Sequence, residues 1–162
     1  MKKDSTRNVA FGGMIAALYV VLTYVANLFG LASGAIQVRL SEALTIMPVF
    51  TAAAIPGLAV GCVLANLLTG CLPLDIVFGS AATLIGAIGT RLLRKRPYLA
   101  WIPPVVSNAV IVPFVLLYYA TEYEVTDPWA ILVLTVGAGE IISCGLLGMM
   151  LYQSLKKAKI EF

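Results

Sequence analysis

The sequence predicts an all-α membrane protein, a six-transmembrane-helix bundle with both termini in the cytoplasm. Of its 162 residues, 60% are hydrophobic and 12% are charged, about half the charged fraction of an average soluble domain. At about 20 residues per spanning helix, the chain has room for six or seven helices. No length remains for a folded soluble domain, so we expect residues 1–162 to form one integral domain of the cell membrane.

The distribution of basic residues predicts the orientation of this domain. Ten of the eleven Lys and Arg residues fall in three clusters: Lys2, Lys3 and Arg7; Arg91, Arg94, Lys95 and Arg96; and Lys156, Lys157 and Lys159. Basic loops are retained on the cytoplasmic side of a membrane, which places both termini and the middle loop inside. These anchors account for the net charge of +3, so the charge indicates no nucleic-acid partner.

The apolar runs between the clusters predict spans at about 9–29, 39–54, 57–68, 75–93, 98–120 and 129–152. The first run is too long for the core of a secretory signal and is expected to remain as a helix. Pro56 and Gly57 divide the second and third spans. Both are shorter than a full crossing of the bilayer requires, so we expect short, tilted or partly re-entrant helices.

The later spans have recognisable starts and bends. Asp75 follows Pro73 and is expected to cap the start of the fourth helix. Pro103, Pro104 and Pro113 are expected to bend the fifth helix. The connection at 121–128 is acidic and carries no basic residue, which favours the outer side of the membrane.

A few polar side chains interrupt the apolar spans. A charged side chain at the centre of an inserting helix costs about 2.5–3.5 kcal/mol, so a polar residue there needs a partner, a cavity or a function. The candidates for a solute site are Gln37, Arg39, Glu42, Asn66, Asp75, Asn108 and Glu140. Glu140 is expected about 16 Å into the last helix, near the bilayer midplane.

Each candidate also has a purely structural alternative. Glu140 could be a protonated carboxyl group bonded to a neighbouring helix, and Asn66 and Asn108 could join helices by hydrogen bonds. Arg39 and Glu42 are three residues apart and share a helix face. We expect them at the outer start of the second helix, as a polar mouth that meets a solute. The alternative is a local ion pair with Arg39 extended to the headgroups.

Small residues in the first span predict a surface for close helix contact. Gly12, Gly13, Ala16 and Ala17 form two overlapping pairs at a spacing of four residues, which allows another helix to approach closely. A partner protein is one candidate for that helix. The alternative is packing within the chain, because Gly57 and Gly61 repeat the same spacing.

The sequence lacks the residues and motifs that several classes of function require. The chain has no histidine, no phosphate-binding glycine loop, and neither a nucleophile elbow nor an HExxH helix. We therefore expect no enzyme activity, no cofactor, no metal site and no ATP hydrolysis by this chain. It is also small for a carrier built from two repeats. A binding subunit of a larger machine is favoured over a proton-coupled carrier using Glu140 or a structural membrane protein.

The polar positions lie in motifs that resemble the QueT family of queuosine-precursor transporters. The motifs are IQVRLSEALT at 36–45, AIPG at 54–57, ANLL at 65–68, PLDIVFGS at 73–80, SNA at 107–109 with Pro113, and GEIIS at 139–143. The resemblance implies a substrate-binding (S) component of an energy-coupling factor transporter. Such a component captures a deazaguanine-type base outside the cell and associates with a membrane coupling protein and two cytoplasmic ATPases.

The resemblance also implies roles for individual residues. A guanine-like edge presents a ring N–H and an amine, which one carboxylate can accept together. Glu140 or Glu42 would provide that carboxylate, and Asn66, Asn108 or Gln37 would bind the lactam oxygen and ring nitrogens. An Ala-xxx-Ala pair on helix 1 of these proteins contacts the coupling protein. Here Gly13 with Ala17, or Gly12 with Ala16, would substitute. An S component for another vitamin or nucleobase is the alternative.

Overall fold

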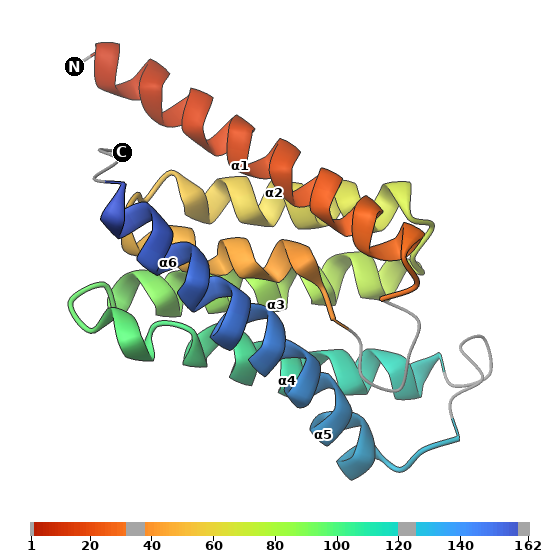
Figure 1. Ribbon diagram of the computed structural model, residues 1–162. Helices are drawn as coiled ribbons and strands as arrows, with labels where there is room; N and C mark the ends of the chain where they lie inside the picture. The colour runs from red at the N-terminus through yellow and green to blue at the C-terminus, as the bar shows by residue number, and fades with distance from the viewer. Residues whose placement is uncertain (1, 32–37, 120–125, 159–162) are drawn as a thin grey trace.

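The computed structural model describes residues 2–31, 38–119 and 126–158, which form a bundle of helices without a strand (Figure 1). The elements are α1 (Lys2–Leu28), η1 (Leu40–Val49), α2 (Ala54–Leu68), α3 (Pro73–Leu92), η2 (Pro97–Leu99), α4 (Ile102–Tyr118), α5 (Trp129–Glu140), η3 (Ile141–Leu147) and α6 (Gly148–Lys157). Since α5, η3 and α6 form one continuous helix, these ranges confirm the predicted count of six.

Within the described ranges, four helical segments are long and apolar enough to cross a membrane. They are Ser5–Leu28, Pro73–Leu92, Pro97–Tyr118 and Trp129–Lys157. The helices η1 and α2 are apolar but shorter. Large apolar side chains such as Val9, Phe114 and Leu134 are more than half exposed. An exposed apolar surface of this extent fits contact with lipid, in agreement with the predicted membrane domain.

The segments that carry the basic clusters gather at one end of the bundle. The start of α1, the connection between α3 and α4, and the end of α6 all lie at the left in Figure 1. We call this the basic end. Lys159 lies outside the described residues. The arrangement is the one that the positive-inside rule requires of cytoplasmic segments, and the side of the membrane stays a prediction.

The short helix η1 runs through the middle of the bundle and contacts α1, α2, α3, η3 and α6. The α-helix predicted at 39–54 is wrong here, because η1 is a ten-residue 3₁₀ helix that ends at Val49. Pro48 lies inside it and lacks the N–H that an α-helical turn would use. Within η1, Thr45 donates its hydroxyl to the carbonyl oxygen of Glu42 at 2.6 Å.

Two other predicted helix starts are also corrected. The third predicted helix begins at Ala54 and not at Gly57, because Pro56 is tolerated in a first turn, where its N–H would have no partner. The fourth begins at Pro73 with Leu72 as its N-cap residue. Asp75 therefore lies within the first turn and is not the N-cap residue.

Glycines allow two helix pairs to pack backbone against backbone. A β-carbon on Gly57 of α2 would lie 2.5 Å from the carbonyl oxygen of Gly12 on α1. A β-carbon on Gly86 of α3 would lie 2.6 Å from the Cα atom of Pro104 on α4. Both distances are shorter than any van der Waals contact, so these positions require glycine for the helices to approach as they do.

Candidate functional site

Glu42 on η1 is fully buried and is held in place by side chains from two other helices. Its Oε1 atom accepts hydrogen bonds from the hydroxyl of Tyr19 on α1 and, at 3.3 Å, from the hydroxyl of Thr83 on α3. Its Oε2 atom has no hydrogen-bond partner among the described residues. One carboxylate oxygen is therefore fixed, and the other is available.

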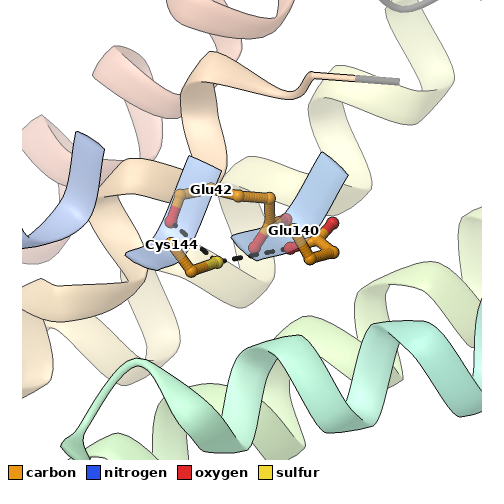
Figure 2. Close-up of side chains that lie close together, drawn as sticks. All are labelled: Glu42, Glu140 and Cys144. Atoms are coloured by element: carbon orange, nitrogen blue, oxygen red, sulfur yellow. Dashed lines mark hydrogen bonds between the residues drawn. The ribbon is translucent and has the colours of Figure 1, made fainter. Parts of the chain in front are cut away.

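Glu140, the last residue of α5, lies next to Glu42 and is 4% exposed. Cys144, one turn later, donates its thiol to Glu140 Oε2 at 3.2 Å and to the carbonyl oxygen of Glu42 at 3.5 Å (Figure 2). One side-chain ligand atom from each of Glu42, Glu140 and Cys144 lies within 4.8 Å of the others. By spacing alone, these three side chains could hold a metal ion. We call them the acidic cluster.

Two further buried polar side chains lack normal hydrogen bonds within the part of the chain that the structure describes. Asn108 on α4 is fully buried, and its amide is close enough to the Glu140 carboxylate to interact with it, but neither its nitrogen nor its oxygen makes a hydrogen bond of normal geometry in the described chain. The hydroxyl of Ser80 on α3 is also buried without a partner. Leaving a buried polar group unpaired costs about 1–3 kcal/mol. These groups and Glu42 Oε2 can therefore be satisfied by a bound molecule.

Arg39 lies just before η1, close to Glu140 and Glu42, and its place in an outer polar mouth stays a prediction. Its backbone N–H donates to the hydroxyl of Ser143, which lies three residues after Glu140, at 3.1 Å. The half-buried Arg39 side chain interacts electrostatically with Asp75, Glu140 and Glu42. The contacts of η1 with η3 bring this residue close to Glu140.

Asn66 and Asp75 form a contact between α2 and α3. Asn66 donates its amide to the carbonyl oxygen of Asp75 at 3.5 Å and to the sulfur of Cys62 at 3.7 Å. The same sulfur accepts a hydrogen bond from Thr83 at 3.5 Å, which connects this contact to Glu42. The Asn66 contact is a hydrogen bond between two helices, which is the structural role considered for this residue as the alternative to solute binding. Roles of Asn66 and Asp75 in solute binding stay predictions. Gln37 lies outside the described residues.

The sequence analysis did not single out four side chains that complete the site. Tyr19 could have been noticed as a phenol half-way along an apolar span, where its hydroxyl needs a partner. Ser80 and Thr83 are three residues apart on α3 and share a face. Nothing in the sequence around Cys144 indicated a role in the site, apart from the apolar surroundings that predict its burial. It lies in η3, a π-helix, and such local widenings of a helix are frequent at functional sites.

The structure separates the two small-residue pairs of α1. Gly12 and Ala16 pack against α2, where β-carbons on Gly57 and Gly61 would lie 2.5 Å from Gly12 and 3.0 Å from Ala16. Gly13 and Ala17 are exposed, and a β-carbon on Gly13 would meet nothing within 4 Å. A groove of about 430 Å³ runs along this side, lined by Ser5, Asn8, Val9, Gly12, Gly13, Ala16, Ala53, Pro56, Gly57 and Val60.

A sequence profile of the QueT transporter family matches residues 9–157. The chain belongs to the QueT transporter family. This match confirms the resemblance that was inferred from motifs such as those at 36–45 and 139–143. All elements from α1 to α6 lie at least partly within it, so the buried cluster of this QueT family member is built entirely from the matched region.

A relative in Lactococcus lactis subsp. cremoris is named queuosine precursor transporter QueT and is 34% identical over 85 residues. The aligned stretch covers 52% of this chain and 50% of the relative, so the chain spans about half the length of the curated relative that it matches. No solved structure matches the chain.

Proposed function

We propose that this QueT family member is the substrate-binding membrane subunit of an energy-coupling factor importer. It binds a queuosine precursor or salvaged base of the deazaguanine class at the outer side of the cell membrane. A partner module of one membrane coupling protein and two cytoplasmic ATPases then drives uptake. The chain needs no cofactor of its own in this scheme. The name of the Lactococcus lactis relative supports this choice of solute.

The observation that carries the proposal is the set of unpartnered buried atoms around the acidic cluster. Glu42 Oε2 is an acceptor, and the amide of Asn108 is both a donor and an acceptor. A guanine-like base presents two N–H donors on one edge, next to a lactam oxygen. Glu42 Oε2 would accept one of the two donors, and Asn108 would donate to the oxygen. Binding would then supply hydrogen-bond partners to these buried groups.

The partner would dock on the exposed face of α1. Gly12 and Ala16 are occupied by α2, whereas Gly13 and Ala17 are free to accept another helix. The groove beside them widens this surface toward α2. The surface extends from the middle of α1 toward the basic end, where a cytoplasmic ATPase module would meet the protein. Both termini are cytoplasmic in this arrangement.

A proton-coupled carrier that works alone is the second candidate. Its support is Glu140, a buried carboxyl group in the middle of a long apolar helix, which accepts a hydrogen bond from the thiol of Cys144. Such groups form proton relays in transporters. This candidate predicts transport without an ATPase, which the first does not.

Uptake into proteoliposomes separates the two. The full chain is reconstituted alone and with a coupling protein and its ATPases, and entry of a radiolabelled 7-deazaguanine derivative is measured with and without ATP. Uptake only in the complete, ATP-supplied system supports the proposal. Uptake by the chain alone under a pH gradient contradicts it and supports the carrier. Mass spectrometry of solutes that co-purify with the chain tests whether another vitamin or nucleobase is bound instead.

A further inference from the structure

The groove between α1 and α2 follows from the way in which these two helices cross. They touch at Gly12 and Gly57, since a β-carbon on Gly57 would lie 2.5 Å from the carbonyl oxygen of Gly12. From there the helices separate toward the basic end (Figure 1). The groove between them has a volume of about 430 Å³, within the usual range of small-molecule sites. Glycines at positions 12, 13 and 57 line it, so little side-chain volume fills it.

The groove lies at the depth of the membrane and opens onto the surface of the bundle. Val9 and Val60, one on each wall, are 73% and 51% exposed. The apolar span of α1 begins at Ser5, the lining residue nearest the start of the chain. An open apolar surface at this depth is covered by lipid or by another protein. In the isolated subunit, a hydrocarbon chain is the occupant that the membrane itself supplies.

The lining is polar at one end only, and its length matches one leaflet. The two polar side chains, those of Ser5 and Asn8, lie at the end of the groove nearer the basic end, and the other lining residues are apolar or glycine. Ala16 follows Ser5 by 11 residues (16 − 5), which is about 16 Å along α1. Half of the hydrocarbon core of a bilayer is about 15 Å thick. A phospholipid has the same layout, with a polar headgroup on chains one leaflet deep.

The charge at the polar end of the groove favours an anionic headgroup. Lys2 and Lys3 precede Ser5 in the sequence, and Arg7 follows it. Asp4 is the acidic residue of this segment, so residues 2–8 carry a net charge of +2 (3 − 1). Each Lys or Arg next to the membrane surface strengthens the attraction of anionic lipids. A phosphate group without a compensating amine is therefore favoured over a zwitterionic headgroup.

We propose that the groove between α1 and α2 binds one anionic phospholipid from the leaflet at the basic end. One acyl chain lies along Gly12, Gly13 and Gly57. Ser5 and Asn8 donate hydrogen bonds to the headgroup, beside the basic start of α1. The inference goes beyond the proposed function and does not depend on it. Because Gly13 also belongs to the docking face proposed above, the lipid has to leave before a coupling helix packs against Gly13.

Native mass spectrometry of the full chain, purified in detergent and titrated with lipid, tests this inference. Phosphatidylglycerol and phosphatidylcholine with identical acyl chains are compared. We expect saturable binding of one phosphatidylglycerol, about tenfold tighter than that of phosphatidylcholine, because basic residues attract the anionic headgroup. Free glycerol 3-phosphate should not compete, since the acyl chain contributes most of the binding free energy. Displacement of the lipid by glycerol 3-phosphate would indicate a phosphate site and contradict a lipid site.

Two variants fill the groove from opposite walls. Gly13→Leu places a side chain where a β-carbon meets nothing within 4 Å, and Val60→Trp enlarges an exposed side chain of α2. Each should weaken phosphatidylglycerol binding by about tenfold or more, because the acyl chain loses buried methylene groups. Ala17→Leu is the matched control, since Ala17 is exposed one turn after Gly13 and outside the groove. It should bind lipid like the wild type.

The charge is tested separately from the groove. Lys2→Gln combined with Lys3→Gln should still bind one lipid but no longer prefer phosphatidylglycerol. The inference is overturned if both groove-filling variants bind phosphatidylglycerol as tightly as Ala17→Leu does, or if the wild type binds the two lipids equally. No solute and no coupling module are present in these titrations, so neither result bears on the proposed function.

Discussion

The hydroxyl of Tyr19 on α1 donates a hydrogen bond to Glu42 on η1, 23 residues later in the chain, and both side chains are buried. Tyr19 also packs against α2, where a β-carbon on Gly61 would lie 2.8 Å from the Tyr19 Cβ atom. On the other face of α1, Gly13 and Ala17 are exposed. One helix therefore carries both a contact to the candidate solute site and the candidate docking surface.

Replacing Tyr19 with phenylalanine removes one of the two donors that fix Glu42 Oε1. We expect Tyr19→Phe to weaken binding of a 7-deazaguanine ligand by about tenfold or more, because a hydrogen bond to a charged group contributes about 1.5–3 kcal/mol. Calorimetric titration of the purified variant measures this. Tyr24→Phe is the control, since Tyr24 lies on the same helix and is 54% exposed. Equal affinity in the two variants would exclude Tyr19 from the site.

The contact between α1 and α2 depends on Gly57. Gly57→Ala places a β-carbon 2.5 Å from the carbonyl oxygen of Gly12, so the helices must separate. We expect a loss of about 1–3 kcal/mol in the free energy of unfolding, typical of overpacking. Thermal unfolding in detergent micelles detects it as a lower midpoint. Gly13→Ala, at a position with open space, should unfold like the wild type. A wild-type midpoint for Gly57→Ala would show that this close approach is not required.

The docking proposal predicts that bulky side chains on the exposed face of α1 block assembly. Gly13→Phe and Ala17→Phe should reduce co-purification with the coupling module by about tenfold or more while leaving ligand affinity unchanged, because a close helix contact cannot accommodate them. Ile85→Phe on α3 is the matched control, since Ile85 is also exposed on the bundle surface. If both α1 variants assemble fully with the coupling module, the exposed face of α1 is not the docking surface.

Arg91 connects the end of α3 to the end of η1. Its Nη1 atom donates to the carbonyl oxygens of Pro48 at 2.9 Å and Val49 at 3.4 Å. Arg91→Ala leaves these carbonyl groups without that donor, and we expect a loss of about 1–2 kcal/mol in the free energy of unfolding. Thermal unfolding measures it against Arg94→Ala, because Arg94 is exposed in the same basic cluster. Similar midpoints for the two variants would show that the Arg91 contacts contribute nothing.

Features with a strong physical signature were predictable from the sequence. Apolar length and the spacing of basic residues predicted the helix count and the separate position of Arg39. The cost of burying charge singled out Glu42 and Glu140, which lie next to each other in the structure although 98 residues separate them in the chain (140 − 42). Burial cost identifies which residues need partners, but it does not say which partners they find.

The form and depth of η1 were not predictable. An apolar run with a proline near its end is compatible with an α-helix or a 3₁₀ helix, and tertiary packing decides between them. Because η1 packs against η3, Glu42 lies next to Glu140 and Arg39 lies near both. The π-helix at η3 was hidden for the same reason, since its residues Ile141–Leu147 are equally compatible with an α-helix.

Asn108 tests most directly the central claim that the unpartnered polar groups of the bundle are kept for a bound molecule. Asn108→Leu replaces a fully buried amide that has no hydrogen-bond partner with an apolar side chain of similar size. Ligand affinity and thermal unfolding of the full chain in nanodiscs are measured together. We predict an unliganded variant at least as stable as the wild type that binds a 7-deazaguanine ligand at least about tenfold more weakly. Unchanged affinity, or lower stability of the unliganded variant, would contradict the account.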